Sequence, residues 1–133
     1  MRRLLLPLLL TVSLAACGSD EATPSAGKDA KLASLTVTVD DDGADGSGKA
    51  RELKLECDEP TDSQACGAAA GVSAADVGKP PGDTACTMIY GGPEEATIKG
   101  TIRGAEVDAS FKRTDGCEIA RWEKVQALLA EVK

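Results

Sequence analysis

Four cysteines in the last two thirds of the chain constrain its fold more than any other feature. They are Cys57, Cys66, Cys86 and Cys117, and a fifth, Cys17, lies near the N-terminus. In an exported chain, four cysteines are typical of two disulfides, and they permit three different pairings. The rest of the chain after the N-terminal region forms one domain of about 100 residues, whose core alone would be marginal, so two crosslinks would contribute substantially to its stability.

The N-terminus supplies the evidence for export. A basic start, Arg2-Arg3, is followed by a Leu-rich apolar run that ends in small residues at position 16. Because that run is too short to cross a bilayer, residues 1–16 are predicted to be a secretory signal. The LAAC sequence that ends at Cys17 resembles the lipobox of bacterial lipoproteins. The resemblance implies cleavage before Cys17 and lipid on its thiol, which leaves an even number of cysteines for disulfides.

The lipid would hold the exported protein at the extracellular face of the cytoplasmic membrane. Residues 18–31 are small or polar and show no apolar periodicity, which predicts a flexible tether. The expected organisation is therefore a signal peptide at 1–16, a lipidated cysteine with its tether at 17–31, and a folded domain at 32–133.

Within this domain, four stretches alternate apolar and polar residues with the period of two that is typical of half-buried strands. They cover residues 35–39, 53–57, 96–102 and 107–111. A polar, Gly-rich run between the first two predicts a loop that joins antiparallel strands, and Gly104-Ala105 predicts the turn of a hairpin. Residues 86–90 form an apolar run between two breaker clusters. This run is either a further, buried strand or an exposed loop stiffened by a disulfide.

Two helices are expected to pack on the sheet. Residues 62–77 are rich in Ala and predict a short helix that begins at Asp62 or Ser63. Residues 117–132 predict an amphipathic helix, with Trp122 interpreted as a core residue and a binding anchor as the alternative. Its apolar positions are Ile119, Trp122, Val125, Leu128 and Leu129. The predicted fold class is α+β, with an antiparallel sheet of about five strands, two helices and two disulfides.

Composition excludes several classes of function. The chain has no histidine, which removes Ser-His-Asp and Cys-His catalysis and the usual imidazole metal sites. Its formal net charge is −7 and it has one Trp, one Tyr and one Phe, so nucleic acid is not an expected partner. The carboxylates show no paired acid–base spacing. We therefore expect a binding protein that is not an enzyme and needs no cofactor or metal.

One partial metal motif lies in the loop before residue 53. Asp41, Asp45, Gly46 and Glu52 match positions of a calcium-loop template, but Gly43 stands where a ligand is needed. The flanks are predicted strands, whereas the template requires helices, so calcium binding is not expected here.

The segment Cys86-Thr87-Met88-Ile89-Tyr90, the upstream pair Cys57 and Cys66, and Cys117 in the sequence DGCEIAR occur together in this chain. In combination they resemble the bacterial subtilisin inhibitor-like (SSI-type) family of serine protease inhibitors, over about residues 32–130. The resemblance implies that Ala85 to Tyr90 form a reactive loop that enters the protease cleft as a substrate does. It also implies the disulfides Cys57–Cys66 and Cys86–Cys117.

The same resemblance implies that Met88 fills the primary specificity pocket and that Met88-Ile89 is the scissile bond. A large apolar residue there predicts subtilisin-like or chymotrypsin-like targets, because trypsin requires Arg or Lys. Two positions depart from the family pattern. Thr87 stands where Pro is frequent, and Asp115 stands at the loop-support position where an Asn is frequent, although Asp has no amide donor.

The expected function is thus a membrane-anchored inhibitor whose partners are a serine endopeptidase and, through the lipid on Cys17, the membrane. A second copy of the chain, forming a homodimer, is a further candidate partner. The alternative is a cell-surface interaction module that keeps the inhibitor fold and inhibits nothing.

Overall fold

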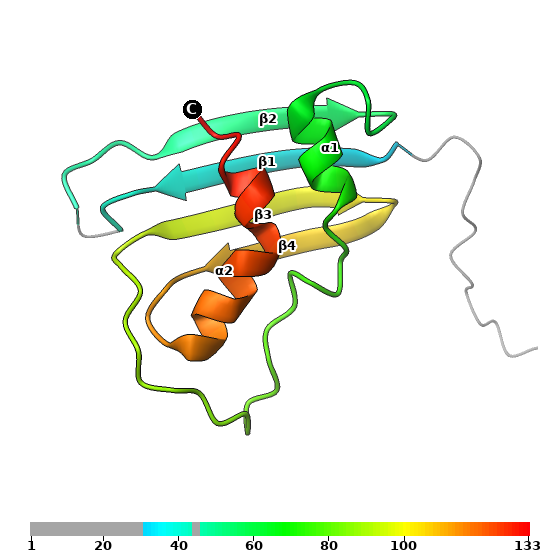
Figure 1. The fold of residues 1–133 in the computed structure, drawn as a ribbon. Coiled ribbons are helices and arrows are strands. Elements are labelled where there is room, and N and C mark those ends of the chain that lie inside the picture. Colours follow the sequence, from blue (N-terminus) through cyan, green and yellow to red (C-terminus); the bar gives the residue numbers. More distant parts are fainter. Residues whose placement is uncertain (1–30, 44–45) are drawn as a thin grey trace, which may run out of the picture.

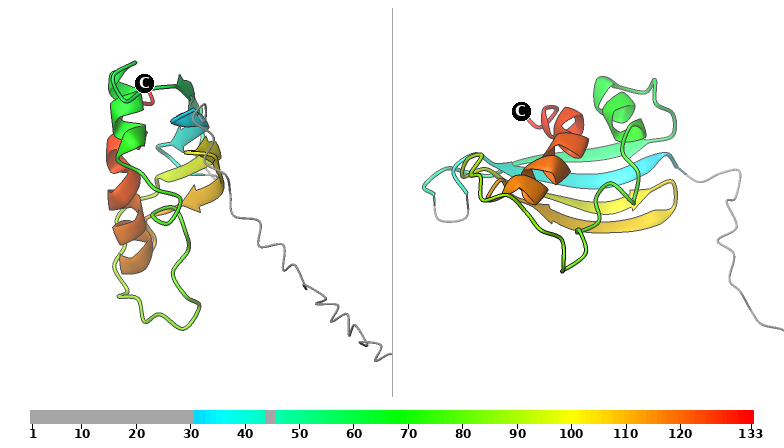
Figure 2. Two further views of the ribbon diagram at one scale, coloured as in Figure 1. Left: turned by 90° about the vertical axis from the view of Figure 1, so that its right-hand side faces the viewer. Right: turned by 60° about the horizontal axis from the view of Figure 1, so that its bottom comes forward.

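The structure is a computed structural model that describes residues 31–43 and 46–133. The predicted signal peptide, the lipidation site Cys17 and the tether before Lys31 lie outside the described residues, as does Asp45 of the partial calcium motif. In the described part, an antiparallel sheet carries two helices on one of its faces, which gives an α+β fold (Figures 1 and 2). Neither helix has the length and the apolar run that a membrane crossing would need.

The sheet has four strands in the order β2-β1-β3-β4. The strands are β1 (Ala33–Asp40), β2 (Arg51–Cys57), β3 (Glu95–Ile102) and β4 (Ala105–Phe111). All neighbours are antiparallel, and the central strand β1 pairs with both β2 and β3. All four strands that the period of two predicts are confirmed, with bounds that differ by a few residues.

The expectation of about five strands is wrong by one. The apolar run 86–90 does not join the sheet formed by the described residues. Its backbone bonds instead to the connection between β4 and the following helix, and its large side chains face solvent. Of the two alternatives that the sequence left open for this run, the structure therefore has the exposed loop next to a disulfide and not the buried strand.

The core lies between the sheet and the helices. Along β1, buried residues alternate with half-buried ones, so Leu35, Val37 and Val39 face inward. Val37 pairs with Leu53 on one side and with Ile98 on the other, and Val37 and Ile98 are fully buried. Burying an aliphatic side chain of this size contributes roughly 1.5–3 kcal/mol. The inward-facing residues of neighbouring strands thus form a continuous apolar layer under the helices.

The turn between β3 and β4 explains why this hairpin is so clear in the sequence. Its two central residues, Arg103 and Gly104, have φ values of 48° and 79°. Positive φ at both positions is typical of a type I′ turn, which matches the twist of the two strands. The Arg103 guanidinium donates to the carbonyl oxygens of Val72 and Ala70, so the hairpin also holds the chain after the first helix.

The first helix, α1 (Gln64–Ala70), begins after Ser63, whose hydroxyl accepts a hydrogen bond from the amide of Cys66. This confirms one of the two predicted start positions. The predicted end at residue 77 is wrong, because the helix stops at Ala70 with Gly71 as its C-cap and turns follow. The Cys57–Cys66 disulfide joins the end of β2 to this helix, and both sulfur-bearing residues are buried.

The second helix, α2 (Gly116–Leu129), is capped by Asp115 and packs Val125, Leu128 and Leu129 into the core. It ends three residues before the predicted Val132, which is nevertheless buried. Trp122 packs against the core as a half-buried side chain, in agreement with its interpretation as a core residue.

The loop between β1 and β2 has a local ion pair. The guanidinium of Arg51 donates to both carboxylate oxygens of Asp41 at 2.7 Å and to the carbonyl oxygen of Val132 at 2.6 Å. The carboxylate at the first position of the calcium template is therefore paired with an arginine.

Candidate functional site

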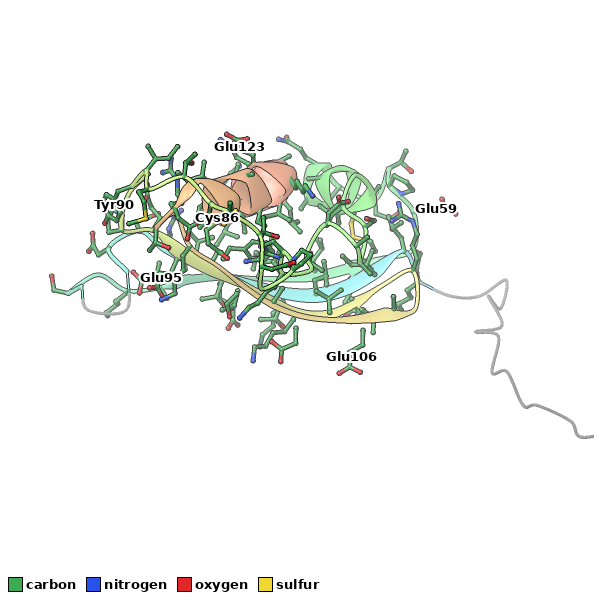
Figure 3. All side chains as sticks on the ribbon, turned by 90° about the horizontal axis from the view of Figure 1, so that it is seen from below. Glu59, Cys86, Tyr90, Glu95, Glu106 and Glu123 are labelled. Carbon is green, nitrogen blue, oxygen red and sulfur yellow. A yellow bond between two sulfur atoms is a disulfide. The ribbon has the colours of Figure 1, made fainter. Side chains whose placement is uncertain are left out.

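Three apolar side chains stand apart from the rest of the molecule because they face solvent. Met88 is 99% exposed, Ile89 56% and Tyr90 68%. They follow one another on the loop between α1 and β3, and Figure 3 places Tyr90 at the opposite end of the molecule from Glu59. We call these three residues the apex. Consecutive exposed apolar side chains indicate a contact surface, since burial is their usual environment.

The chain just before the apex is held by two contacts with the beginning of α2. Cys86 forms a disulfide with Cys117, which closes a loop of sequence separation 31. A crosslink over such a loop contributes about 3.7 kcal/mol through chain entropy. One residue later, the carbonyl oxygen of Thr87 accepts a hydrogen bond from the amide of Gly116 at 2.9 Å.

The chain just after the apex is held by the segment that joins β4 to α2. The amide of Gly91 donates to the carbonyl oxygen of Arg113 at 2.7 Å. Glycine suits this approach, since a Cβ on Gly91 would lie 3.0 Å from the side chain of Ile119, which would have to shift to make room. Residues 113–117 therefore hold the loop on both sides of Met88, through one disulfide and two backbone hydrogen bonds.

The apex itself makes a tight turn. The amide of Ile89 donates to the carbonyl oxygen of Thr87 at 2.9 Å, which closes a three-residue turn around Met88. Thr87 thus accepts two hydrogen bonds on one oxygen, one from within the loop and one from Gly116. This turn directs the Met88 side chain away from the protein body, in agreement with its exposure.

Asp115, the residue predicted to support the loop, acts on the helix. Its carboxylate accepts from the amides of Cys117 and Glu118 at 2.9 and 3.0 Å, as a helix N-cap does. It makes no hydrogen bond to the loop within the described structure, and the direct contact comes from the next backbone amide, that of Gly116. Asp115 therefore orders the first turn of α2, which in turn holds Thr87.

A carboxylate and two sulfurs also come together at this place. One ligand atom each of Cys86, Asp115 and Cys117 lies within 4.8 Å of the others. Both sulfurs are joined in the disulfide, so neither is the thiolate that a metal ion would require.

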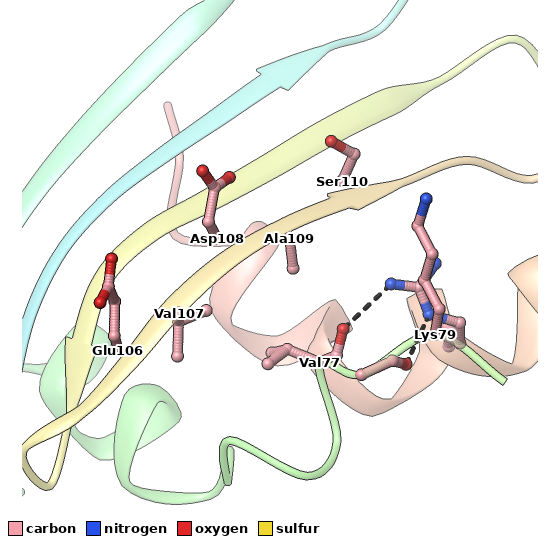
Figure 4. Close-up of a pocket in the computed structure, with 9 residues that line it drawn as sticks. Val77, Lys79, Glu106, Val107, Asp108, Ala109 and Ser110 are labelled. Carbon is pink, nitrogen blue, oxygen red and sulfur yellow. Dashed lines mark hydrogen bonds between the residues drawn. The ribbon is translucent and has the colours of Figure 1, made fainter. Parts of the chain in front are cut away.

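Arg121 is the residue of the site that the sequence reasoning missed. Its guanidinium donates to the carbonyl oxygens of Val77 and Gly78 at 3.0 Å, the bonds drawn as dashed lines in Figure 4. It also donates to both oxygens of Glu118 and lies 4.8 Å from the centre of the Phe111 ring. The side chain is only 5% exposed. Arg121 thereby fixes the chain at Val77 and Gly78, between α1 and Cys86.

A signal for this burial was present in the sequence. Arg121 lies four residues before Val125 and seven before Leu128, so it shares the apolar face of α2. A charged residue on such a face needs partners, and Glu118, one turn earlier, is the nearest candidate.

Arg113 plays a related part after the apex. Its guanidinium donates to Glu94 at 2.8 Å and lies 5.9 Å from the centre of the Trp122 ring, while its carbonyl oxygen holds Gly91. Two arginines, each over an aromatic ring, thus stabilise the two ends of the loop.

Hollows border the loop at several places, and two of them have partly polar walls. One of about 340 Å³ lies between β4 and the chain at Val77 to Lys79, with Ser110 and Arg121 on its walls (Figure 4). Another of about 180 Å³ lies beside Tyr90 and Lys112. These two hollows lack the apolar enclosure that a small-molecule ligand prefers, whereas the apex exposes three apolar side chains to a partner.

Comparisons of the chain with protein-family models, with curated proteins and with solved structures return no match. The likeness to subtilisin inhibitors therefore stays a prediction from the sequence motifs.

Proposed function

We propose that the protein is a membrane-anchored inhibitor of subtilisin-like or chymotrypsin-like serine proteases, with Met88-Ile89 as the bond it presents. One observation carries the proposal. Among the described residues, Met88 has the most exposed large apolar side chain, and residues 113–117 hold the loop that carries it on both sides.

The recognition step follows from the chemistry of the apex. The unbranched Met88 side chain fits a roomy apolar specificity pocket, and the backbone around it pairs with the strands that border a protease cleft. Because the loop is already held by the disulfide and by two backbone hydrogen bonds, little conformational entropy is lost on binding. Such preorganisation converts an interface of ordinary size into a tight one.

Inhibition also requires that cleavage be unproductive. If the enzyme cuts Met88-Ile89, Cys86 stays bound to Cys117 and Gly91 stays bonded to Arg113. The new amine of Ile89 is then kept beside the acyl-enzyme, so religation competes with hydrolysis.

The position of the chain entry supports an anchored inhibitor. Along β1, Ala33 pairs with Ile102 and Asp40 pairs with Glu95, which follows the apex loop. A strand of this length separates the two ends by roughly 25 Å. A tether that ends at Lys31 therefore reaches the domain at the far end of the sheet and leaves the loop accessible to a protease.

A second candidate is the surface interaction module without inhibitory activity. Asp115 favours it, because its carboxylate caps α2 and gives the loop no side-chain hydrogen bond. Thr87 also lacks the fixed φ that a proline would provide.

Titration of subtilisin with the domain, residues 32–133, tests the proposal. We expect stoichiometric loss of subtilisin activity, and we expect Met88→Lys to redirect inhibition towards trypsin, which reads that side chain. Lys79→Met is the matched control, since it changes charge near the loop without touching the apex. A folded, doubly bridged domain that inhibits neither enzyme would favour the interaction module.

A further inference from the structure

We propose that Met88 is an oxidation site and that peroxides switch the loop off by converting its thioether to a sulfoxide. The inhibitory consequence rests on the proposed function, while the chemical modification can be measured by itself.

The composition of the chain makes Met88 a selective target. The sequence has two methionines, and Met88 is the one within the described residues. The four cysteines of the described part are all joined in disulfides, so no thiol there competes for the oxidant. The side chain is 99% exposed, so dissolved peroxide reaches the sulfur without any opening of the fold.

The reaction is a transfer of one oxygen atom. The sulfur lone pair of Met88 attacks one peroxide oxygen, a sulfur–oxygen bond forms, and the oxygen–oxygen bond breaks. The proton on the transferred oxygen passes, directly or through solvent, to the leaving hydroxyl, which departs as water. The thioether is thereby oxidised by two electrons and hydrogen peroxide is reduced. The product is a polar, chiral side chain in place of a flexible apolar one.

The structure separates the effect on recognition from any effect on folding. With its side chain almost wholly in solvent, Met88 adds nothing to the core, and the loop is held by Cys86, Thr87 and Gly91. Oxidation therefore leaves the loop in place. In the apolar pocket of a protease, however, the sulfoxide oxygen has no hydrogen-bond partner, and burying such a group lowers affinity by about 10- to 100-fold.

The same exposure makes the change reversible. Methionine sulfoxide is reduced by two enzymes, one for each sulfoxide epimer, and both need access to the side chain. Since Met88 stands clear of the protein body, repair needs no unfolding.

The test compares the purified protein before and after hydrogen peroxide, with catalase added before any protease assay. Mass spectrometry of peptides is expected to show one added oxygen at Met88, and the inhibition constant for subtilisin is expected to rise about 10- to 100-fold. Treatment with both sulfoxide reductases should restore it. Met88→Leu lies in the binding residue itself and will have an inhibition constant of its own, and peroxide should leave that constant unchanged because the leucine side chain has no sulfur to oxidise.

Two results would overturn the switch: no oxygen uptake at Met88 under conditions that oxidise free methionine, or full uptake with an unchanged inhibition constant. Failure of the proposed function has a different signature. In that case the unoxidised protein and Met88→Leu would both leave subtilisin active. The proposed loss of inhibition on oxidation would then be refuted as well, while mass spectrometry would still show whether Met88 takes up oxygen.

Discussion

The carbonyl oxygen of Thr87 lies 2.9 Å from the amide nitrogen of Gly116, the first residue of α2. This hydrogen bond joins the residue before Met88 to a helix that is itself packed into the core. The position of the apex thus depends on how closely the loop approaches the helix end, and glycine allows that approach. A Cβ on Gly116 would lie 2.0 Å from the Thr87 hydroxyl oxygen.

Gly116→Ala is accordingly expected to displace the loop. Alanine has a higher helix propensity than glycine, so the substitution by itself would stabilise the first turn of α2. A loss of stability or of resistance to cleavage would therefore come from the contact with Thr87. We expect the free energy of unfolding to fall by about 1 kcal/mol, as for a strained rotamer, and subtilisin to cleave Met88-Ile89 faster. Urea unfolding and mass spectrometry of the cleavage products measure the two effects.

Two variants make that experiment specific. Gly82→Ala serves as the control, because a Cβ there has no atom within 4 Å. Adding Thr87→Ala to Gly116→Ala removes the clashing hydroxyl and should recover most of the loss. If the double variant is no better than Gly116→Ala alone, the contact with Thr87 is not the cause.

Arg121→Met is expected to loosen the start of the loop. The change removes the hydrogen bonds to Val77 and Gly78 and leaves the Glu118 carboxylate without its partner. Breaking a buried pair on one side typically costs about 3–5 kcal/mol, and we expect the lower end since Glu118 is partly exposed. Thermal unfolding measures the loss, and hydrogen exchange at residues 77–86 locates it.

The control for Arg121 is Glu123→Met, which removes a charge from an exposed position of the same helix. Arg121→Met/Glu118→Met replaces both partners with apolar groups and should recover part of the stability. An increase in exchange spread evenly over the domain would contradict a local role for Arg121.

Most of the fold could be predicted because the four strands are half-buried and their alternation is local information. The hairpin and the helix start at Ser63 follow from local chemistry in the same way, although the turn lies at Arg103-Gly104, one residue before the predicted Gly104-Ala105, and Ala105 already belongs to β4. The disulfide pairing could not be derived from spacing, and only the family resemblance implied the bridges that the structure contains.

The candidate site was predicted less completely because its contacts join distant parts of the chain. The run 86–90 has the apolar content of a strand, and only its bonds to residues 113–117 show that it is a loop. Likewise, Asp115 looked like a loop-support residue, whereas the geometry of α2 makes it a helix cap. Arg121 has partners 43 and 44 residues earlier, which no local pattern reveals.

The two disulfides should differ in what they control. Replacing Cys86 and Cys117 with Ser frees the chain before the apex, while the hydrogen bonds of Thr87 and Gly91 remain. We expect a folded protein that is less stable by about 3–4 kcal/mol and is cut by subtilisin as an ordinary substrate. Replacing Cys57 and Cys66, which are buried beside β2 and α1, should lower stability with a smaller effect on the ratio of inhibition to cleavage. Circular dichroism and timed mass spectrometry distinguish these outcomes, and equal cleavage of the two variants would contradict this division.

The acid dependence of stability should depend in part on Asp76, in the turn that leads to the loop. The Ser73 hydroxyl and the Ser73 amide both donate to its carboxylate, at 2.6 and 3.0 Å, and these bonds lower the pKa of Asp76 below its ordinary value. A lowered pKa in the folded state means that the stabilisation is fully present above the unfolded pKa, about 3.9 for Asp. It is lost as the pH falls through the lower pKa of the folded state.

The free energy of unfolding of Asp76→Asn, measured from pH 6 to pH 2, should therefore fall less steeply below pH 4 than that of the wild type. Asp83→Asn, at an exposed loop position without a hydrogen bond to its side chain in the described structure, is the control and should follow the wild-type curve. Identical curves for Asp76→Asn and the wild type would show that the Ser73 bonds do not favour the ionised carboxylate.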